Sequence, residues 1–283
     1  MQMNSVFYTK PDFINTDPRK DRKERYNVNP EFMTYRHEAL LPPDMLEGKS
    51  ILDIGCCVGA TGAWALEHGA RYYAGVEINE TLCDLASNNL RTNFGGNHWD
   101  IFNMSFEDYF EQHGTDQFDI VFISGTLYAG LDWMRLVENL TKVADHVVIE
   151  SFHPNIAAYV DDAEGSFVNF LKTHPDIMEK MENTAAFVFI KEIFMYSDDG
   201  KNNLLNYGAA PSMGALKLQM ERLGYIPNTA CNDLLKSTIP GWYHDMARFG
   251  IHFKRIGHID TNYLTVRELY ANPEKRKERL QAW

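Results

Sequence analysis

Short apolar runs alternate with helix-forming stretches along the first half of the chain. The apolar runs are rich in β-branched and aromatic residues and predict five strands, at Ile51–Ile54, Tyr72–Val76, Trp99–Asn103, Phe118–Ile123 and His146–Glu150. Helices are predicted between them at Ala60–His68, Thr81–Leu90 and Leu131–Val143, and a turn at Met104–Glu107. This alternation is typical of an α/β protein whose parallel sheet is covered by helices on both faces.

The pattern resumes after a long interruption. Ser212 is placed as the N-cap of a helix that ends near Gly224, and two more strands are predicted, from Tyr225 onward and over Arg248–Lys254. About 60 residues separate the fifth strand from Ser212, whereas most connections have about 4–6. We therefore expect an insertion that covers the ligand cleft, with helix-like sequence at Phe167–Thr173.

The turn after the first strand is rich in glycine, and a carboxylate ends the next strand. Gly55 and Gly59 allow a sharp turn and a close approach of the backbone to a ligand. Glu77 stands where a carboxylate can accept hydrogen bonds from both hydroxyls of a ribose, which indicates a cofactor that contains adenosine. The spacing from Gly55 to Gly59 and Gly62 does not fit G-x-G-x-x-G, so a dinucleotide is disfavoured.

These residues carry a family resemblance. Asp53, Gly55, Cys56 and Gly59 resemble motif I (D-x-G-C-x-x-G) of the class I S-adenosylmethionine-dependent methyltransferases, with Cys57 in place of the usual central glycine. The resemblance implies S-adenosylmethionine as cofactor. It also implies a Rossmann-like, doubly wound, mostly parallel seven-stranded sheet with an antiparallel last strand, here with a helical insertion. A βαβ unit of another doubly wound protein is the alternative interpretation.

Ligands of open α/β sheets lie at the carboxyl ends of the strands. The resemblance implies that the glycine turn lies under the methionine part of the cofactor, that Glu77 holds the ribose and that Ile78 covers the adenine. Phe106 is predicted either to flank the adenine or to pack in the core. The predicted cofactor-binding residues are Asp53, Gly55, Cys56, Cys57, Gly59, Glu77, Ile78, Ser105, Phe106, Ser124 and Gly125.

Candidate catalytic residues follow the fourth and fifth strands. Tyr128 is placed to line the acceptor pocket, and His153 and Glu150 are candidate general bases at the same edge of the sheet. His153 can equally be a loop residue that caps the strand.

A short helix is predicted at Glu31–Leu40, before the first strand. Tyr35, Arg36 and His37 in this segment either fold over the cofactor or belong to a surface helix.

Two longer segments are similar to the tRNA wobble-uridine carboxymethyltransferases and related small-molecule methyltransferases. Phe118–Tyr128 resembles their F-D-x-V-F-x-x-G-V-L-Y-H pattern, with Ala129 in place of the histidine. Ala210–Tyr225 resembles their P-S-x-x-x-L-x-x-x-L-x-x-x-G-F helix. The carboxylated cofactor of that tRNA enzyme needs cationic partners, which we cannot place in this sequence, so ordinary methyl transfer is favoured.

Composition narrows the function further. The 283 residues contain 27 Lys and Arg against 39 Asp and Glu, a formal net charge of -12 that disfavours sequence-independent binding to phosphate backbones. The four cysteines form no C-x-x-C pair, and no metal site is predicted. No segment is predicted to span a membrane, and the first residues are too polar for a signal peptide, so we expect a cytoplasmic protein with reduced thiols.

We expect a methyltransferase that acts on an O or N atom of a small or medium organic acceptor and gives S-adenosylhomocysteine. Two alternatives stay open: an RNA (tRNA)-modifying methyl- or carboxymethyltransferase, if the basic segments 19–25 and 275–279 fold together, and a non-catalytic S-adenosylmethionine-binding module. The expected divisions are an arm and cap (1–47), a cofactor-binding core (48–154), an insertion over the acceptor cleft (155–210), the rest of the core sheet (211–260) and a basic tail (261–283). The sequence predicts no oligomeric state.

Overall fold

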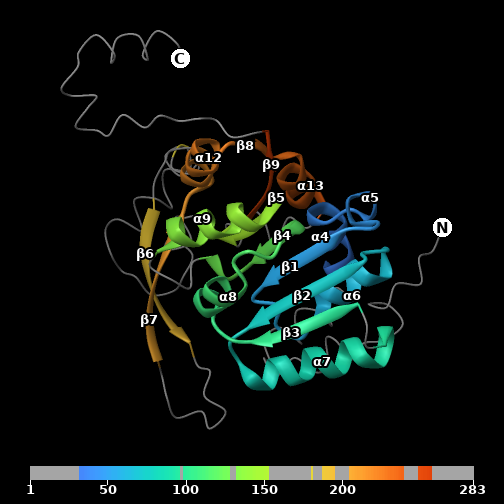
Figure 1. Cartoon of the computed structure of the whole chain (residues 1–283). Helices are drawn as coiled ribbons and strands as arrows, with labels where there is room; N and C mark the ends of the chain where they lie inside the picture. The colour runs from blue at the N-terminus through green and yellow to red at the C-terminus, as the bar shows by residue number, and fades with distance from the viewer. Residues whose placement is uncertain are drawn as a thin grey trace, which may run out of the picture.

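The computed structural model describes residues 32–95, 98–127, 132–152, 180, 187–194, 204–238 and 248–256. Seven strands form one sheet in the order β3-β2-β1-β4-β5-β9-β8 (Figure 1). These strands are β1 (Ser50–Ile54), β2 (Tyr72–Glu77), β3 (Trp99–Asn103), β4 (Phe118–Ser124), β5 (Ala144–Phe152), β8 (Tyr225–Asn228) and β9 (Arg248–Arg255). Strands β1 to β5 are parallel, and β9 is antiparallel to both β5 and β8. The predicted Rossmann-like, mostly parallel seven-stranded sheet with an antiparallel last strand is confirmed.

Helices cover both faces of the sheet because the strand side chains alternate between two apolar cores. Leu52 and Ile54 of β1 belong to one core, with side chains from α8, α9 and α12, whereas Ile51 belongs to the other, with side chains from α4, α6, α7 and α13. The helices are α4 (Phe32–Leu40), α5 (Pro43–Leu46), α6 (Ala60–Glu67), α7 (Glu80–Phe94), α8 (Phe106–His113), α9 (Trp133–Val143), α12 (Met213–Arg222) and α13 (Ala230–Thr238). None of the described helices is long and apolar enough to cross a membrane.

Three of these helices, α5, α8 and α13, differ from the sequence prediction. Helix α8 begins at Phe106, where only a turn was expected, because the Ser105 hydroxyl accepts a hydrogen bond from Asp108 N over 3.0 Å and caps the helix. Helix α13 follows β8 directly and was not predicted. The predicted N-cap Ser212 of α12 is confirmed, since its side chain accepts from Ala215 N over 3.0 Å.

The described part of the insertion is a β-ribbon. Strands β6 (Phe187–Phe194) and β7 (Leu204–Pro211) pair antiparallel in a sheet of their own, beside α9 in Figure 1, and β7 leads into α12. The expected helical character is wrong for these residues, because the run F-V-F-I-K-E-I-F is rich in the aromatic and β-branched residues that favour strands. The helix expected at Phe167–Thr173 lies outside the described residues.

Candidate functional site

The turn between β1 and α6 requires glycine at two positions. Gly55 and Gly59 have φ angles of 79° and 81°, in the left-handed region that side chains disfavour. A Cβ at Gly55 would collide with the side chain of Thr126, which follows β4. A Cβ at Gly59 would lie 3.3 Å from the Cα of Ala86 in α7. The turn is therefore packed closely between α7 and the loop after β4.

Glu77 is fixed at the carboxyl end of β2 by the backbone around it. Its Oε2 accepts a hydrogen bond from Cys57 N over 3.1 Å, and its Oε1 accepts one from Asn79 N over 3.0 Å. Because each carboxylate oxygen has two acceptor positions, both can still accept a ligand hydroxyl. The neighbouring Ile78 is 72% exposed, an unusual state for a large apolar side chain. The fixed carboxylate can bind the hydroxyls of a ribose, and the exposed apolar side chain beside it can contact an attached purine.

Cys57 is the one described non-glycine residue with positive φ, at 55°. Its N–H is the group that donates to Glu77, so this backbone conformation connects the glycine turn to the carboxylate. The preceding residue, Cys56, is buried, and burial raises the pKa of its thiol well above the usual value. Cys56 is therefore an apolar packing residue beneath the turn.

Asp53 lies buried in β1 among neutral partners. The Tyr73 hydroxyl donates to Asp53 Oδ2 over 2.7 Å, and the Thr61 hydroxyl lies within hydrogen-bond reach. Burial raises the pKa of Asp53 to about 7, although the hydrogen bond from Tyr73 and the charge of Arg36 oppose this shift. Asp53 therefore holds its proton through much of the acidic and neutral range.

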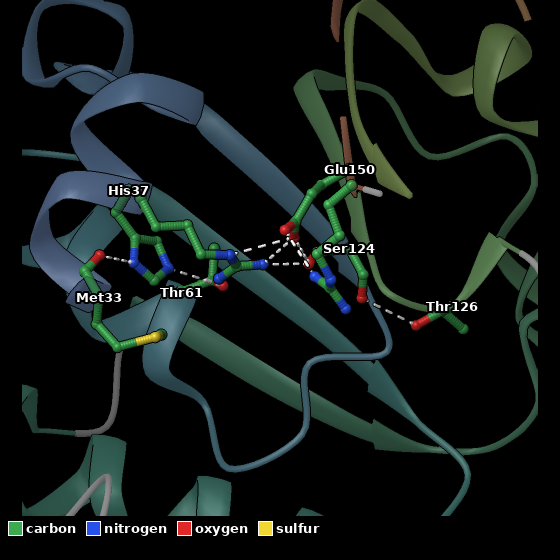
Figure 2. Close-up of polar contacts among 8 residues, drawn as sticks. Met33, His37, Thr61, Ser124, Thr126 and Glu150 are labelled. Atoms are coloured by element: carbon green, nitrogen blue, oxygen red, sulfur yellow. Dashed lines mark hydrogen bonds and ion pairs between the residues drawn. The ribbon is translucent and has the colours of Figure 1, made fainter. Parts of the chain in front are cut away.

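His37 of helix α4 contacts Thr61 of α6, which lies beside this carboxyl group; Figure 2 shows the contacts of His37 with Met33 and Thr61. Its Nδ1 lies 2.7 Å from the carbonyl oxygen of Met33, which can only accept, so Nδ1 carries the proton. Burial, and then the charge of Arg36, lower the pKa of His37 to about 3, so the ring is neutral and Nε2 accepts from the Thr61 hydroxyl over 3.3 Å. The Thr61 side chain also contacts Asp53, and this hydrogen bond, like that from Tyr73, opposes the rise that burial causes in the pKa of Asp53.

Glu150, which is 0% exposed near the end of β5, is enclosed by two arginines. Arg36 Nε of α4 donates to Glu150 Oε2 over 3.1 Å, and Arg36 Nη2 contacts the same oxygen more closely. Arg248 Nη1 of β9 donates to Oε1 over 2.7 Å. Ser124, at the end of β4, donates to Glu150 and accepts from Arg36; Figure 2 shows Ser124 and Glu150 facing each other.

This environment bears on the predicted catalytic role of Glu150. Burial alone would raise the pKa of Glu150, but the guanidinium groups of Arg36 and Arg248 outweigh burial and hold the pKa well below its usual range. A carboxylate that stays charged and accepts from three side chains is poorly suited to remove a proton from an acceptor. The geometry gives Glu150 a positioning role and does not favour a general base.

The surface-helix interpretation of α4 is wrong for two of its residues. Arg36 is 9% exposed and His37 is 0% exposed, because α4 packs on the sheet and directs both side chains into the site. Arg248 was predicted only as the first residue of a strand. Its signal in the sequence is a cation at the start of a strand whose alternate residues are apolar, with no indication of its partner.

The remaining predicted residues fall into three groups. Ser105 caps α8, and Gly125, with φ of 67°, donates from its N–H to the Glu150 carbonyl oxygen over 3.1 Å. Phe106 packs against the core and also lines a cavity of about 240 Å³ between α8 and α9. Tyr128 and His153 lie outside the described residues. The described residues contain no cluster of His, Cys, Asp and Glu that could hold a metal ion.

The segment that contains the glycine turn is similar in sequence to a known protein family. Residues 52–146, from β1 into β5, match a family model described as a methyltransferase domain. The fold is similar to that of a protein from Listeria monocytogenes named as an S-adenosylmethionine-dependent methyltransferase, with a TM-score of 0.54 and 14% identity, covering 80% of this chain and 99% of that chain. Residues 52–146 therefore match a methyltransferase domain, and the likeness of the whole chain to the Listeria protein is one of fold.

Two other solved structures are similar to this chain at lower TM-scores. An S-adenosylmethionine-dependent methyltransferase from Mesorhizobium loti has 17% identity and a TM-score of 0.48, covering 80% of this chain and 97% of that chain. The magnesium protoporphyrin IX methyltransferase of Synechocystis, with bound S-adenosylhomocysteine, has 14% identity and a TM-score of 0.47, covering 82% of this chain and 86% of that chain. No curated protein sequence matches the chain significantly. Arg36, Glu150 and Arg248 all lie outside the matched residues 52–146.

Proposed function

We propose that this protein moves the methyl group of S-adenosylmethionine to an oxygen or nitrogen atom of a small or medium organic acceptor and releases S-adenosylhomocysteine. The observation that supports cofactor binding best is Glu77, whose two oxygens are aimed by Cys57 N–H and Asn79 N–H beside the exposed Ile78. In this proposal Glu77 binds the ribose hydroxyls and Ile78 covers the adenine.

The other cofactor contacts follow from the sheet order. Because β1 lies between β2 and β4, a ribose at Glu77 places the rest of the cofactor over the glycine turn and toward the end of β4. Gly55 and Gly59 then lie beneath the methionine part, and Ser124 and Gly125 lie toward the sulfonium. Asp53, Cys56 and Cys57 shape the turn, and Ser105 and Phe106 border the adenine.

The reaction needs alignment more than activation. Held by Glu77 and by the turn at Gly55 and Gly59, S-adenosylmethionine would supply an activated methyl group to an acceptor atom aligned in line behind it, with S-adenosylhomocysteine as the leaving group. A hydroxyl acceptor must also lose a proton to a base, whereas a neutral amine needs little more than desolvation. His153 is the candidate base and Tyr128 the candidate residue of the acceptor pocket.

The cofactor half of the proposal is tested by titration of S-adenosylhomocysteine in a calorimeter. Glu77→Ala is expected to weaken binding by about 1–3 kcal/mol, because charged hydrogen bonds to the ribose are lost. Glu221→Ala is the matched control, since Glu221 is an exposed residue near the end of α12 and should leave affinity unchanged. Equal affinity of Glu77→Ala and the unmodified protein would remove Glu77 from the site.

The acceptor half is tested by transfer of isotope-labelled methyl groups from S-adenosylmethionine into a cell extract that is then separated into RNA, protein and small-molecule fractions. We expect label in the small molecules, because the net charge of -12 opposes binding to phosphate backbones. Label in RNA would replace the proposed acceptor with a nucleic acid. Binding of the cofactor without any transfer would instead favour a non-catalytic module.

A further inference from the structure

Helices α8 and α9 enclose a cavity of about 240 Å³ on the face of the sheet opposite α7 (Figure 1). A cavity of about 150 Å³ is large enough for a benzene molecule, so this one can hold a single ring with a short chain. Phe106 begins α8 and Asp132 is the N-cap of α9, and both line the cavity. Because these helices follow β3 and β4, the cavity begins at the carboxyl edge of the sheet and runs along both helices.

The inner wall of the cavity is apolar. Phe106 and Phe110 lie one turn apart on α8, are partly buried and pack against the core. Leu136 of α9 faces them across the cavity and is 3% exposed. Such a wall favours the apolar part of a ligand, and aromatic rings also attract cations.

The other lining side chains make the cavity acidic. Glu107 and Glu111 of α8 and Asp132 of α9 are exposed carboxylates, and Arg135 is the one cation among the lining residues. Three negative charges against one positive charge leave a formal charge of two negative units. In the part of the chain that the structure describes, the side chains of Glu107, Glu111 and Arg135 form no hydrogen bond or ion pair. If Arg135 turned toward one carboxylate, the other two would still lack a counter-charge.

Stabilisation of the two helices explains only part of this arrangement. Asp132 caps α9, since its Oδ1 accepts from Arg135 N over 3.0 Å, and Glu107 in the first turn of α8 favours the positive end of the helix dipole. Glu111 lies in the second turn, beyond the range of this effect, and four positions from Glu107, where like charges destabilise a helix. A cation in the cavity would relieve this repulsion.

We propose that the cavity between α8 and α9 binds a small organic cation in which a short chain joins a protonated amine to a ring. The ring lies against Phe106 and Phe110, and the ammonium group lies at the carboxylates of Glu107 and Glu111. The site shares only Phe106 with the contacts proposed for S-adenosylmethionine, so the inference does not rest on the proposed function.

The test is a titration of the full chain, followed by ligand-observed NMR, with three probes of similar size. Phenethylamine is a cation at pH 7, 2-phenylethanol is neutral and 3-phenylpropionate is an anion. Phenethylamine is expected to bind with a dissociation constant of about 0.1–1 mM, a usual value for so small a ligand. It should bind about 5-fold or more tightly than 2-phenylethanol, because its ammonium group meets exposed carboxylates, and 3-phenylpropionate should bind more weakly than both.

Two double variants locate the site. Glu107→Gln with Glu111→Gln should reduce the preference for phenethylamine over 2-phenylethanol to about 2-fold or less, because the charges that attract the amine are lost. Glu80→Gln with Asp84→Asn is the matched control, since it removes two exposed acids with the same spacing from α7, on the other face of the sheet, and should keep the full preference. The ratio of two affinities within one variant is independent of how much of that variant is folded.

A full preference in the α8 variant, or an equal loss in the α7 variant, would overturn the inference. Equal affinities of the unmodified protein for phenethylamine and 2-phenylethanol, or no binding of either, would overturn it as well. None of these results bears on the titration of S-adenosylhomocysteine against Glu77→Ala, so a failure of this inference is distinguishable from a failure of the proposed function.

Discussion

Asp53 and Glu150 are both fully buried near the carboxyl ends of neighbouring parts of the sheet, and both feel the charge of Arg36, yet their pKa values shift in opposite directions. Burial raises the pKa of Asp53 to about 7, whereas the pKa of Glu150 is held well below its usual range. The difference lies in their partners. Asp53 faces the neutral hydroxyls of Tyr73 and Thr61, but Glu150 contacts two guanidinium groups directly.

Burial tends to raise the pKa of both carboxyl groups, and direct contact with charged side chains decides whether the final pKa is raised or lowered. It also separates two roles. Asp53 can exchange a proton near neutral pH, while Glu150 remains charged and links β5 to α4 and β9. Substitutions of these groups, and of a partner of Asp53, probe the distinction.

The largest effect is expected for Glu150→Gln. Removal of this charge leaves Arg36 and Arg248 buried without a counter-charge, so the free energy of unfolding should fall by about 3–5 kcal/mol. Denaturant titration at pH 7 measures it. Glu138→Gln is the control, because Glu138 and its partner Arg222 are about two-fifths and one-third exposed and should contribute less than about 1 kcal/mol. Equal losses in both variants would mean that the enclosed pair is no more important than a surface pair.

The contribution of Glu150 to the free energy of unfolding also depends on pH, and the direction follows from its pKa. The pKa of Glu150 is lower in the folded than in the unfolded chain, so its contribution is present above the unfolded value of about 4.3 and is lost as pH falls through the folded pKa. The loss on acidification belongs to the unmodified protein and should be absent in Glu150→Gln.

Asp53→Asn should have the opposite pH signature. The folded pKa of about 7 lies above the unfolded value, so the folded state binds more protons and the unmodified protein loses stability as pH rises toward and through 7. Between pH 5 and 8 the loss attributable to Asp53 is about 2–3 kcal/mol, and Asn should abolish it. Unfolding curves at both pH values measure the difference.

Asp119→Asn is the control for this experiment. The pKa of Asp119 is lowered, despite partial burial, by hydrogen bonds from Ser50 and by Arg71 and Lys49. Its substitution should therefore leave the change between pH 5 and 8 as it is in the unmodified protein. If Asp53→Asn and Asp119→Asn gave the same change, Asp53 would be charged throughout this range and the contrast with Glu150 would disappear.

The smallest effect is expected for Tyr73→Phe. Loss of the hydroxyl removes a donor to Asp53, which should raise the pKa of Asp53 further and lower the free energy of unfolding at pH 8 by about 1–3 kcal/mol. The loss should be smaller at pH 5, where Asp53 is protonated. Tyr72→Phe, whose hydroxyl donates to the exposed partner Asp100, should cost less than about 0.5 kcal/mol. A loss in Tyr73→Phe that did not change with pH would contradict the proposed pairing.

Local patterns account for what the sequence predicted well. Strand β1, the turn at Gly55 and Gly59, α6 and β2 were predicted closely because each depends on residues within one short segment. Helix α8 also had a local signal, since Ser105 and Asp108 form a capping pair, but the apolar run after β3 was too short to suggest a helix. The ribbon of β6 and β7 had a strand-like composition that gave no indication of its pairing partner.

Contacts between distant residues explain what was missed. Arg36 and Glu150 are separated by 114 positions and Glu150 and Arg248 by 98, so no spacing rule connects them. The sequence therefore suggested Glu150 as a base, although its partners give it a different environment. Asp53 was predicted at the site, but its pKa depends on burial and on opposing contacts with Tyr73, Thr61 and Arg36, which only the folded arrangement brings together.

The position of β9 between β5 and β8 also affects how the chain folds while it is being synthesised. Ribosomes add about 5–20 residues per second, so Arg248 follows Glu150 by about 5–20 s. During this interval the strand Ala144–Phe152 has an unpaired edge that includes Val147, Val148 and Ile149. Unpaired apolar edges promote aggregation and are bound by chaperones. The strand that brings the second arginine to Glu150 is thus the one that closes this edge, and the nascent protein is most exposed to misassembly in the seconds before that strand emerges.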